Sequence, residues 1–167
     1  MMFKRFHKFF LSGCLRFMPL MAFIKTNRLL ISLMGHQISK TARIWSSIEF
    51  LGTLHLTVGE DTFIGHRCSF AGNDCQIKIG NYCDISSNVS FVSGSHKIDL
   101  SGLHLAGEGF SKDITIGSRV WIGHGTILLG GISVGDNVII GAGSLVNKDI
   151  PANTIYAGIP AKFIRKL

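Results

Sequence analysis

Two histidines, His96 and His104, lie in a glycine- and serine-rich stretch near the middle of the chain, residues 92–113. A neutral imidazole, whose ordinary pKa lies near 6.5, can accept a proton from a hydroxyl group at cellular pH. Either side chain could therefore act as general base in a reaction whose nucleophile is a hydroxyl oxygen. Long irregular stretches between regular elements usually serve a function.

A six-residue repeat flanks this stretch on both sides and defines the elements that must position it. Each unit begins with an aliphatic residue, several units have glycine second, and the fifth residue is small or β-branched. The units after the stretch start at Ile116, Ile122, Leu128, Val134, Ile140 and Val146. The units before it start at Ile38, Ile44, Val58, Ile64, Ile79 and Ile85.

A period of six predicts a parallel β-helix, because amphipathic helices would need apolar residues three to four positions apart. Each unit would form one short strand and a turn, with its first and fifth side chains pointing inward. Three units would complete one triangular coil, and stacked coils would bury their apolar faces against each other. We expect the second-position glycine to support a strained turn backbone.

The chain divides into a basic, apolar, helical N-terminal segment, residues 1–35, and a β-helix domain, residues 36–167. The domain includes a protruding loop, residues 92–114, and a C-terminal tail, residues 152–167. Residues 1–34 carry six lysines and arginines and no acidic residue. Their apolar spacing predicts two short helices, which cap the open first coil, contact an anionic membrane surface, or do both with different faces. We expect neither a signal peptide nor a membrane-spanning helix.

The four cysteines show neither a CxxC pair nor zinc-ligand spacing; they are Cys14, Cys68, Cys75 and Cys83. Cys68 and Cys83 occupy the fifth position of the repeat, where a small buried side chain is expected. The cysteines are therefore predicted to be reduced thiols in the core, as in cytosolic proteins. We expect no metal site.

The repeats over residues 38–164 resemble the hexapeptide-repeat acyltransferases, closest to the galactoside- and maltose-type enzymes and the surface-polysaccharide O-acetyltransferases. The resemblance implies a mainly β fold: a left-handed parallel β-helix of hexapeptide repeats with an N-terminal helical segment and one protruding loop. It also implies a homotrimer in which the loop walls the active site of a neighbouring subunit. His96 stands where the family has its catalytic histidine, and His104 is the rival base. Glu108 or Asp99, which share the loop, would orient the imidazole.

The coenzyme side of the resemblance rests on three motifs, which begin at Trp121, Ile140 and Ala157. In the family, acetyl-CoA lies in a groove between two subunits. The residues carried over to this groove are Trp121, Gly123, His124, Ala142, Asn147, Lys148, Lys162 and Arg165. The last two would pair with the coenzyme phosphates. Lys162 stands where the family usually has arginine, so the charge is kept but the bidentate fork is lost.

The resemblance implies O-acetyl transfer from acetyl-CoA to a sugar hydroxyl in bacterial surface polysaccharide synthesis. Such an enzyme would be cytoplasmic, near the inner face of the membrane. N-acetylation of an amino sugar nucleotide remains open, as do a non-catalytic scaffold and a carbonic-anhydrase-like metal lyase that would use His66, His96 and His104. His66 is otherwise expected to be a solvated surface residue. The net charge of +7 comes with no nucleic-acid recognition motif, so we expect no nucleic-acid partner.

Overall fold

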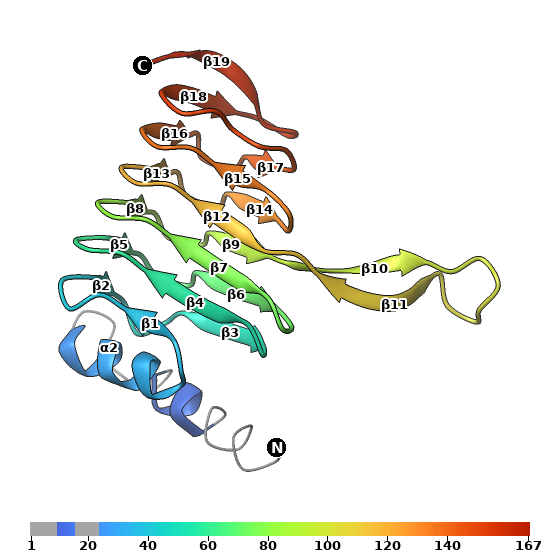
Figure 1. The fold of residues 1–167 in the computed structure, drawn as a ribbon, viewed down its shortest axis with the longest axis horizontal. Helices are drawn as coiled ribbons and strands as arrows, with labels where there is room; N and C mark the ends of the chain where they lie inside the picture. Colours follow the sequence, from blue (N-terminus) through green and yellow to red (C-terminus); the bar gives the residue numbers. More distant parts are fainter. Residues whose placement is uncertain (1–9, 16–23) are drawn as a thin grey trace.

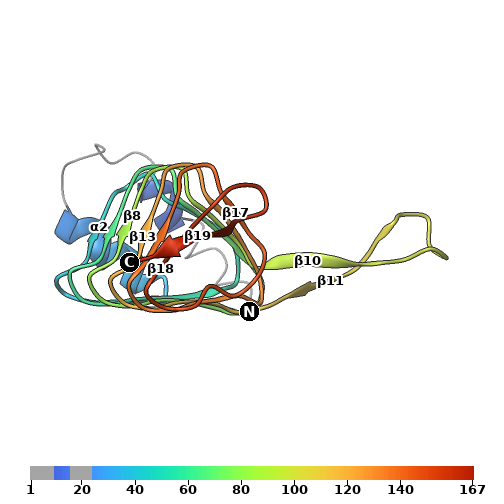
Figure 2. The same cartoon turned by 90° about the horizontal axis from the view of Figure 1, so that it is seen from above.

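The computed structural model describes residues 10–15 and 24–167, and from Gln37 onward the chain forms mostly short parallel strands wound into a three-sided coil (Figure 1). Seen along the coil axis, successive turns superpose as a triangle (Figure 2). The chain visits three sheets, here called A, B and C, in that order on each turn. The turns that join sheet B to sheet C form the B–C corner, and those that join sheet C to sheet A form the C–A corner. The predicted parallel β-helix is confirmed.

Five successive coils each contribute one strand to each sheet, and β18 and β19 extend sheet B at its C-terminal end. Sheet A consists of β1 (Gln37–Ile38), β4 (His55–Val58), β7 (Gln76–Ile79), β12 (Ile114–Ile116) and β15 (Ser133–Val134). Sheet B consists of β2 (Arg43–Ile44), β5 (Phe63–Ile64), β8 (Asp84–Ile85), β13 (Trp121–Ile122), β16 (Val138–Ile140), β18 (Thr154–Ala157) and β19 (Lys162–Lys166). Sheet C consists of β3 (Glu49–Gly52), β6 (Ser69–Gly72), β9 (Ser90–Val92), β14 (Ile127–Leu129) and β17 (Leu145–Val146). All neighbours within these sheets are parallel except β18 and β19, which are antiparallel.

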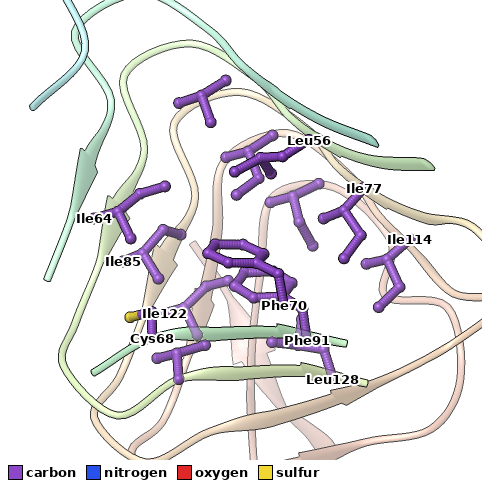
Figure 3. Packing of buried hydrophobic residues seen from close by; sticks show 14 of the residues in the cluster. Leu56, Ile64, Cys68, Phe70, Ile77, Ile85, Phe91, Ile114, Ile122 and Leu128 are labelled. Carbon is purple, nitrogen blue, oxygen red and sulfur yellow. The ribbon is translucent and has the colours of Figure 1, made fainter. Parts of the chain in front are cut away.

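The core consists of columns of first- and fifth-position side chains, as the repeat predicted (Figure 3). On sheet B, Ile122 pairs in register with Ile85 below it and Ile140 above it, and all three are buried. On sheet C, Phe70 and Phe91 stack with ring centroids 4.9 Å apart. Burial of each such side chain contributes roughly 1.5–3 kcal/mol. No coil has a core without the coils next to it, so stability depends on stacking.

The second-position glycines serve a different purpose from the one we expected. None of them has a left-handed backbone; the left-handed residues are instead at the fourth position, for example Arg67 (φ 52°), Asn88 (φ 59°) and Gly143 (φ 67°). A Cβ on Gly123 would lie 2.5 Å from the backbone nitrogen of Ala142 in the next coil. Glycine is therefore required at the second position because neighbouring coils approach closely there, and the expectation of a strained turn was wrong.

Gly123→Ala is expected to lower the free energy of unfolding by about 1–3 kcal/mol, because the added methyl would press against backbone of the next coil. Gly143→Asn is the matched control: Gly143 has no atom within 4 Å of an added Cβ, and asparagine tolerates its left-handed backbone. Urea unfolding at one fixed protein concentration measures both variants. Equal losses in the two would contradict the stacking explanation.

The cysteines in the coils behave as structural thiols. Cys68 is fully buried, and its Sγ lies 3.2 Å from the carbonyl oxygen of Ser86. At the equivalent repeat position, the Oγ1 of Thr62 lies 2.8 Å from the carbonyl oxygen of Gly80. Burial raises the pKa of Cys68 to about 11, and burial likewise raises the pKa of Cys83. A thiol held in its neutral form is a poor nucleophile. The prediction that these residues are core thiols is confirmed.

The described part of the N-terminal segment covers the open end of the first coil. Residues 10–15 are helical, and α2 (Ile24–Leu33) packs on β1 and β2 (Figure 1). From α2, Ile31 is buried, and the side-chain amide of Asn27 donates to the carbonyl oxygen of Ile44 at 3.4 Å. Residues 16–23, between these two helices, lie outside the described residues. No helix within residues 10–15 or 24–167 is long and apolar enough to cross a membrane.

Candidate active site

The stretch that interrupts the repeat forms a β-hairpin that projects from the C–A corner (Figures 1 and 2). Its strands, β10 (Gly94–Ile98) and β11 (Ala106–Ser111), pair antiparallel with each other. In the chain they lie between β9 of sheet C and β12 of sheet A. The hairpin base is tied to the coil below it, because the backbone N–H of Asn73 donates to Ser111 Oγ at 2.9 Å. The predicted loop is thus an ordered arm anchored to the coil.

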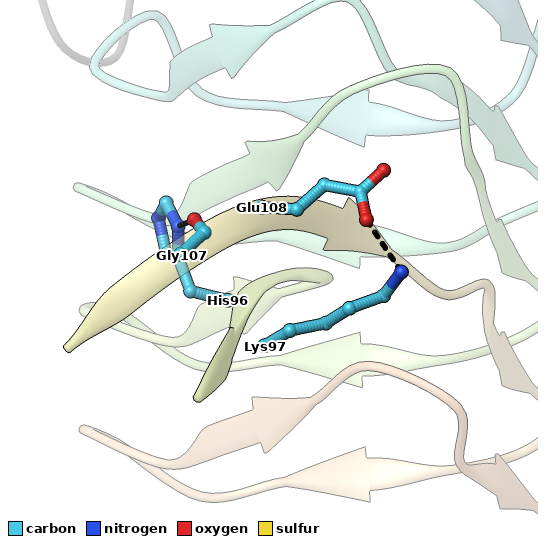
Figure 4. A network of polar contacts seen from close by, with 4 residues as sticks. All are labelled: His96, Lys97, Gly107 and Glu108. Atoms are coloured by element: carbon cyan, nitrogen blue, oxygen red, sulfur yellow. Dashed lines mark hydrogen bonds and ion pairs between the residues drawn. The ribbon is translucent and has the colours of Figure 1, made fainter. Parts of the chain in front are cut away.

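His96 lies on β10 opposite Gly109, and its side chain is exposed. The ring Nδ1 lies 2.8 Å from the carbonyl oxygen of Gly107 (Figure 4). A carbonyl oxygen only accepts hydrogen bonds, so Nδ1 must carry the proton in this contact. In the neutral imidazole, Nε2 then has a free lone pair, which is the state that a general base needs.

Neither carboxylate that we expected to orient His96 does so. Glu108 forms an ion pair with Lys97, 2.5 Å between Oε2 and Nζ, and this pair lies away from the imidazole (Figure 4). Asp99 accepts hydrogen bonds from the hydroxyl and backbone of Ser101, at 2.8 and 2.9 Å, and these bonds lower the pKa of Asp99. That expectation was wrong: the backbone carbonyl of Gly107 holds the ring.

A pocket of about 360 Å³ lies beside His96 at the C–A corner. Asn73 and Asp74 line it from the coil, and Ser95, Phe110 and Ser111 line it from the hairpin. Asp74 is held by the hydroxyl of Thr53, which donates to its Oδ1 at 3.0 Å. Hydroxyl, amide and carboxylate groups around an imidazole suit an acceptor that is rich in hydroxyl groups. Sequence reasoning missed Asn73 and Asp74, although the repeat gains three extra residues between Ile64 and Ile79 at this corner.

His104 lies apart from this pocket, in the exposed turn between β10 and β11. Its neighbours are apolar and among the most exposed side chains of the described chain, with Leu100 at 87% and Leu103 at 100%. Two-stranded hairpins are marginally stable alone, and exposed apolar patches mark interaction sites, so we expect this apolar tip to pack against another protein surface. The structure therefore favours His96 over His104 as the base.

The predicted coenzyme residues fall into two groups at different corners. Trp121 is exposed on β13, His124 and Ala142 lie exposed one above the other at the B–C corner, and Lys162 and Arg165 extend from β19. Asn147 and Lys148 follow β17 at the C–A corner, on the hairpin side. Gly123 is buried, so its contribution is the coil stacking described above.

His124 is held at the B–C corner by two contacts. Its Nε2 accepts from the side-chain amide of Asn88 at 3.3 Å, and its carbonyl oxygen accepts the N–H of Gly143 at 2.8 Å. Sheet C separates this corner from His96, and the five residue-to-residue steps from Gly125 to Gly130 span about 15 Å. One chain therefore does not bring His96 and the predicted coenzyme surface together.

The three histidines of the metal-lyase alternative are dispersed in the same way. His66 lies at the B–C corner, half-buried against Trp45, whereas His96 and His104 lie on the hairpin. Within residues 10–15 and 24–167, no three histidine, cysteine or carboxylate side chains are grouped to share a metal ion. The expectation that His66 is fully solvated was wrong, because Trp45 covers one face of its ring.

Comparisons with known proteins agree on the repeat and on the fold. Residues 113–148 match the family described as "Bacterial transferase hexapeptide (six repeats)", and residues 55–90 match "Hexapeptide repeat of succinyl-transferase". The galactoside O-acetyltransferase of Escherichia coli is 33% identical over 138 residues, which cover 83% of this chain and 67% of that protein. This chain spans between 45% and 67% of the length of the curated relatives it matches.

Two solved structures are similar over nearly the whole chain. The maltose O-acetyltransferase of Clostridium difficile has a TM-score of 0.80 and 30% identity, covering 98% of this chain and 86% of its own. A galactoside acetyltransferase in complex with coenzyme A has a TM-score of 0.84 and 29% identity, covering 98% of this chain and 80% of its own. These likenesses confirm the predicted left-handed parallel β-helix.

Proposed function

We infer, since this chain belongs to the hexapeptide-repeat family of acetyltransferases, that it transfers an acetyl group from acetyl-CoA to a sugar hydroxyl. The observation that carries the proposal is the 2.8 Å contact between His96 Nδ1 and the Gly107 carbonyl oxygen, which leaves Nε2 of the neutral ring free to accept a proton. The polar pocket beside this nitrogen supports a hydroxyl-bearing acceptor. Solved relatives with coenzyme A or acetyl-CoA bound support the donor.

In the proposed reaction, Nε2 of His96 takes the proton from the acceptor hydroxyl as its oxygen attacks the thioester carbonyl carbon. The new C–O bond forms and the C–S bond breaks. The imidazolium then returns the proton to the departing coenzyme thiolate. The products are an acetyl ester of the sugar and free coenzyme A, and the enzyme is unchanged.

The site is completed between subunits in this proposal. The base lies at the C–A corner and the coenzyme surface at the B–C corner, so a neighbouring chain must bring one to the other. A homotrimer with its axis along the coil does this three times by symmetry. The apolar hairpin tip, which has no partner within the described residues, supports the same arrangement. In this arrangement the coenzyme would bind along Trp121, His124 and Ala142.

We place the enzyme in the synthesis of bacterial surface glycans, in the cytoplasm at the inner face of the membrane. Three exposed apolar side chains of the N-terminal segment support a surface contact, namely Phe10, Leu29 and Leu33. The same segment carries the basic residues noted above. Residues 1–9 and 16–23 of this segment lie outside the described structure. Anionic lipid attracts such a combination of apolar and basic side chains.

Calorimetric titration of acetyl-CoA tests the donor side of the proposal. The wild type is expected to bind with a dissociation constant in the micromolar range. Ala142→Trp is expected not to bind, because a large side chain at this exposed position would fill the coenzyme surface while leaving the coil intact. An absence of binding to the wild type would contradict the acetyltransferase proposal, and equal binding to both proteins would contradict the place of the groove.

A further inference from the structure

A second polar pocket lies at the B–C corner, directly below His124. It has a volume of about 260 Å³ and is lined by His66, Arg67, Ser87 and Asn88, which come from two successive coils. None of these residues is acidic. Asn88 also donates to His124, so the pocket continues the corner along which we place the coenzyme. No function has so far been assigned to it.

Arg67 is the charged residue of this pocket. Its backbone is fixed in the left-handed region at φ 52°, and its N–H donates to Ser47 Oγ at 3.1 Å. The guanidinium has neither a hydrogen bond nor an ion pair with any side chain in residues 10–15 and 24–167. His66 beside it is packed on Trp45, and burial followed by the charge of Arg67 lowers the pKa of His66. The pocket therefore offers one permanent cation, the guanidinium of Arg67, beside an imidazole whose pKa is lowered.

The level of this pocket along the coil axis matches that of the general base. The hairpin leaves the coil formed by β8 and β9, which is the coil that contributes Ser87 and Asn88. A rotation about an axis parallel to the coil does not change height, so in the proposed trimer a symmetry-related His96 would reach the B–C corner at the level of these two residues. The pocket would thus face the reacting hydroxyl.

A coenzyme bound along the B–C corner would place its thioester at the height of this pocket along the coil axis. Lys162 and Arg165 place its phosphates at β19, at the C-terminal end of sheet B. From β18 the sheet descends through β16, β13 and β8 to β5, which is four strand spacings or about 19 Å. The thioester end of an extended coenzyme would point down this corner toward Arg67. The acceptor would then lie between the thioester and the pocket.

We propose that Arg67 binds a negatively charged group of the acceptor, so that the substrate is a sugar or glycan carrying a carboxylate or phosphate near the acetylated hydroxyl. This inference rests on the proposed acetyl transfer and on the site between subunits. A planar guanidinium without a protein partner is suited to bidentate binding of either anion.

Acetyl transfer to matched sugars tests this inference. The probes are methyl glucuronide, glucose 6-phosphate and the neutral methyl glucoside, and the two anions distinguish a carboxylate from a phosphate. The wild type is expected to prefer at least one anionic probe. Arg67→Asn is expected to lower kcat/KM for that probe about 10- to 100-fold, the loss of a charge-assisted hydrogen bond, while the value for methyl glucoside changes less than about threefold. Asparagine accepts the left-handed backbone, so the coil should fold.

Arg119→Asn is the matched control, because Arg119 is an exposed arginine with φ 58° at a different corner. It is expected to leave both kcat/KM values unchanged. Acetyl-CoA titration of each protein distinguishes failure of the proposed acetyl transfer from failure of the role of Arg67. A wild type that does not bind acetyl-CoA refutes the proposed function. Binding without preference for an anion, or equal effects of Arg67→Asn on all probes, overturns the role of Arg67. Dissociation of the oligomer by Arg67→Asn would make it an interface residue and also overturn the proposal.

Discussion

His96→Ala is expected to lower kcat for acetyl transfer by about a thousandfold, while the dissociation constant of acetyl-CoA stays within about twofold. General-base catalysis by a positioned side chain contributes roughly a hundred- to ten-thousandfold, and the exposed imidazole is not on the predicted coenzyme surface of its own chain. Release of free coenzyme A in the presence of a sugar acceptor measures the first quantity. Calorimetry measures the second.

Two further variants make this prediction specific. His96→Asn retains an amide that can donate to the Gly107 carbonyl but offers no basic nitrogen, so it should be as inactive as His96→Ala. His104→Ala removes the rival imidazole at the hairpin tip and should keep kcat within about threefold. Substantial activity in His96→Asn would mean that the ring only supports the hairpin. A collapse of activity in His104→Ala alone would transfer the role of base to His104.

The coil was predictable because its determinants are local and repeated. An aliphatic first residue such as Ile122 and a small fifth residue such as Thr126 recur at fixed spacing, and both are buried in the structure. The role of glycine was not predictable from one unit, because the atom that excludes a side chain at Gly123 belongs to Ala142 in the next coil. The sequence shows the glycine, but it does not show the contact between coils that requires it.

The candidate site was predictable in part. The resemblance identified His96, but the group that orients it is a backbone carbonyl, which no residue type at position 107 would reveal. The two corners could have been separated by counting, because His124 and Ala142 are 18 residues apart and so share a corner. Asn147 is 23 residues from His124, one whole coil plus a strand, and so falls at the next corner. The distance between the two groups is the reason for proposing a site that two chains complete.

Mixed trimers of two inactive variants are therefore expected to regain about a third of wild-type activity. One variant, His96→Ala, lacks the base, and the other, Ala142→Trp, lacks an open coenzyme surface. When both are co-expressed with different tags and purified through both, every trimer contains each variant. Of its three sites, one pairs an intact His96 with an intact Ala142, and one lacks both. The third lies between two copies of the same variant and lacks one of the two.

This recovery discriminates sharply between the two arrangements of the site. If the base and the coenzyme surface act within one chain, each chain in the mixture is defective and activity stays at the background of the single variants. Trimers that carry His96→Ala under both tags serve as the control and should remain inactive, which excludes an effect of the tags or of copurified enzyme. Activity near a third of wild type requires the hairpin of one chain to supply Nε2 to the B–C corner of another. The proposed arrangement would bring an imidazole at one corner to a predicted coenzyme surface that lies about 15 Å away across sheet C within a single chain.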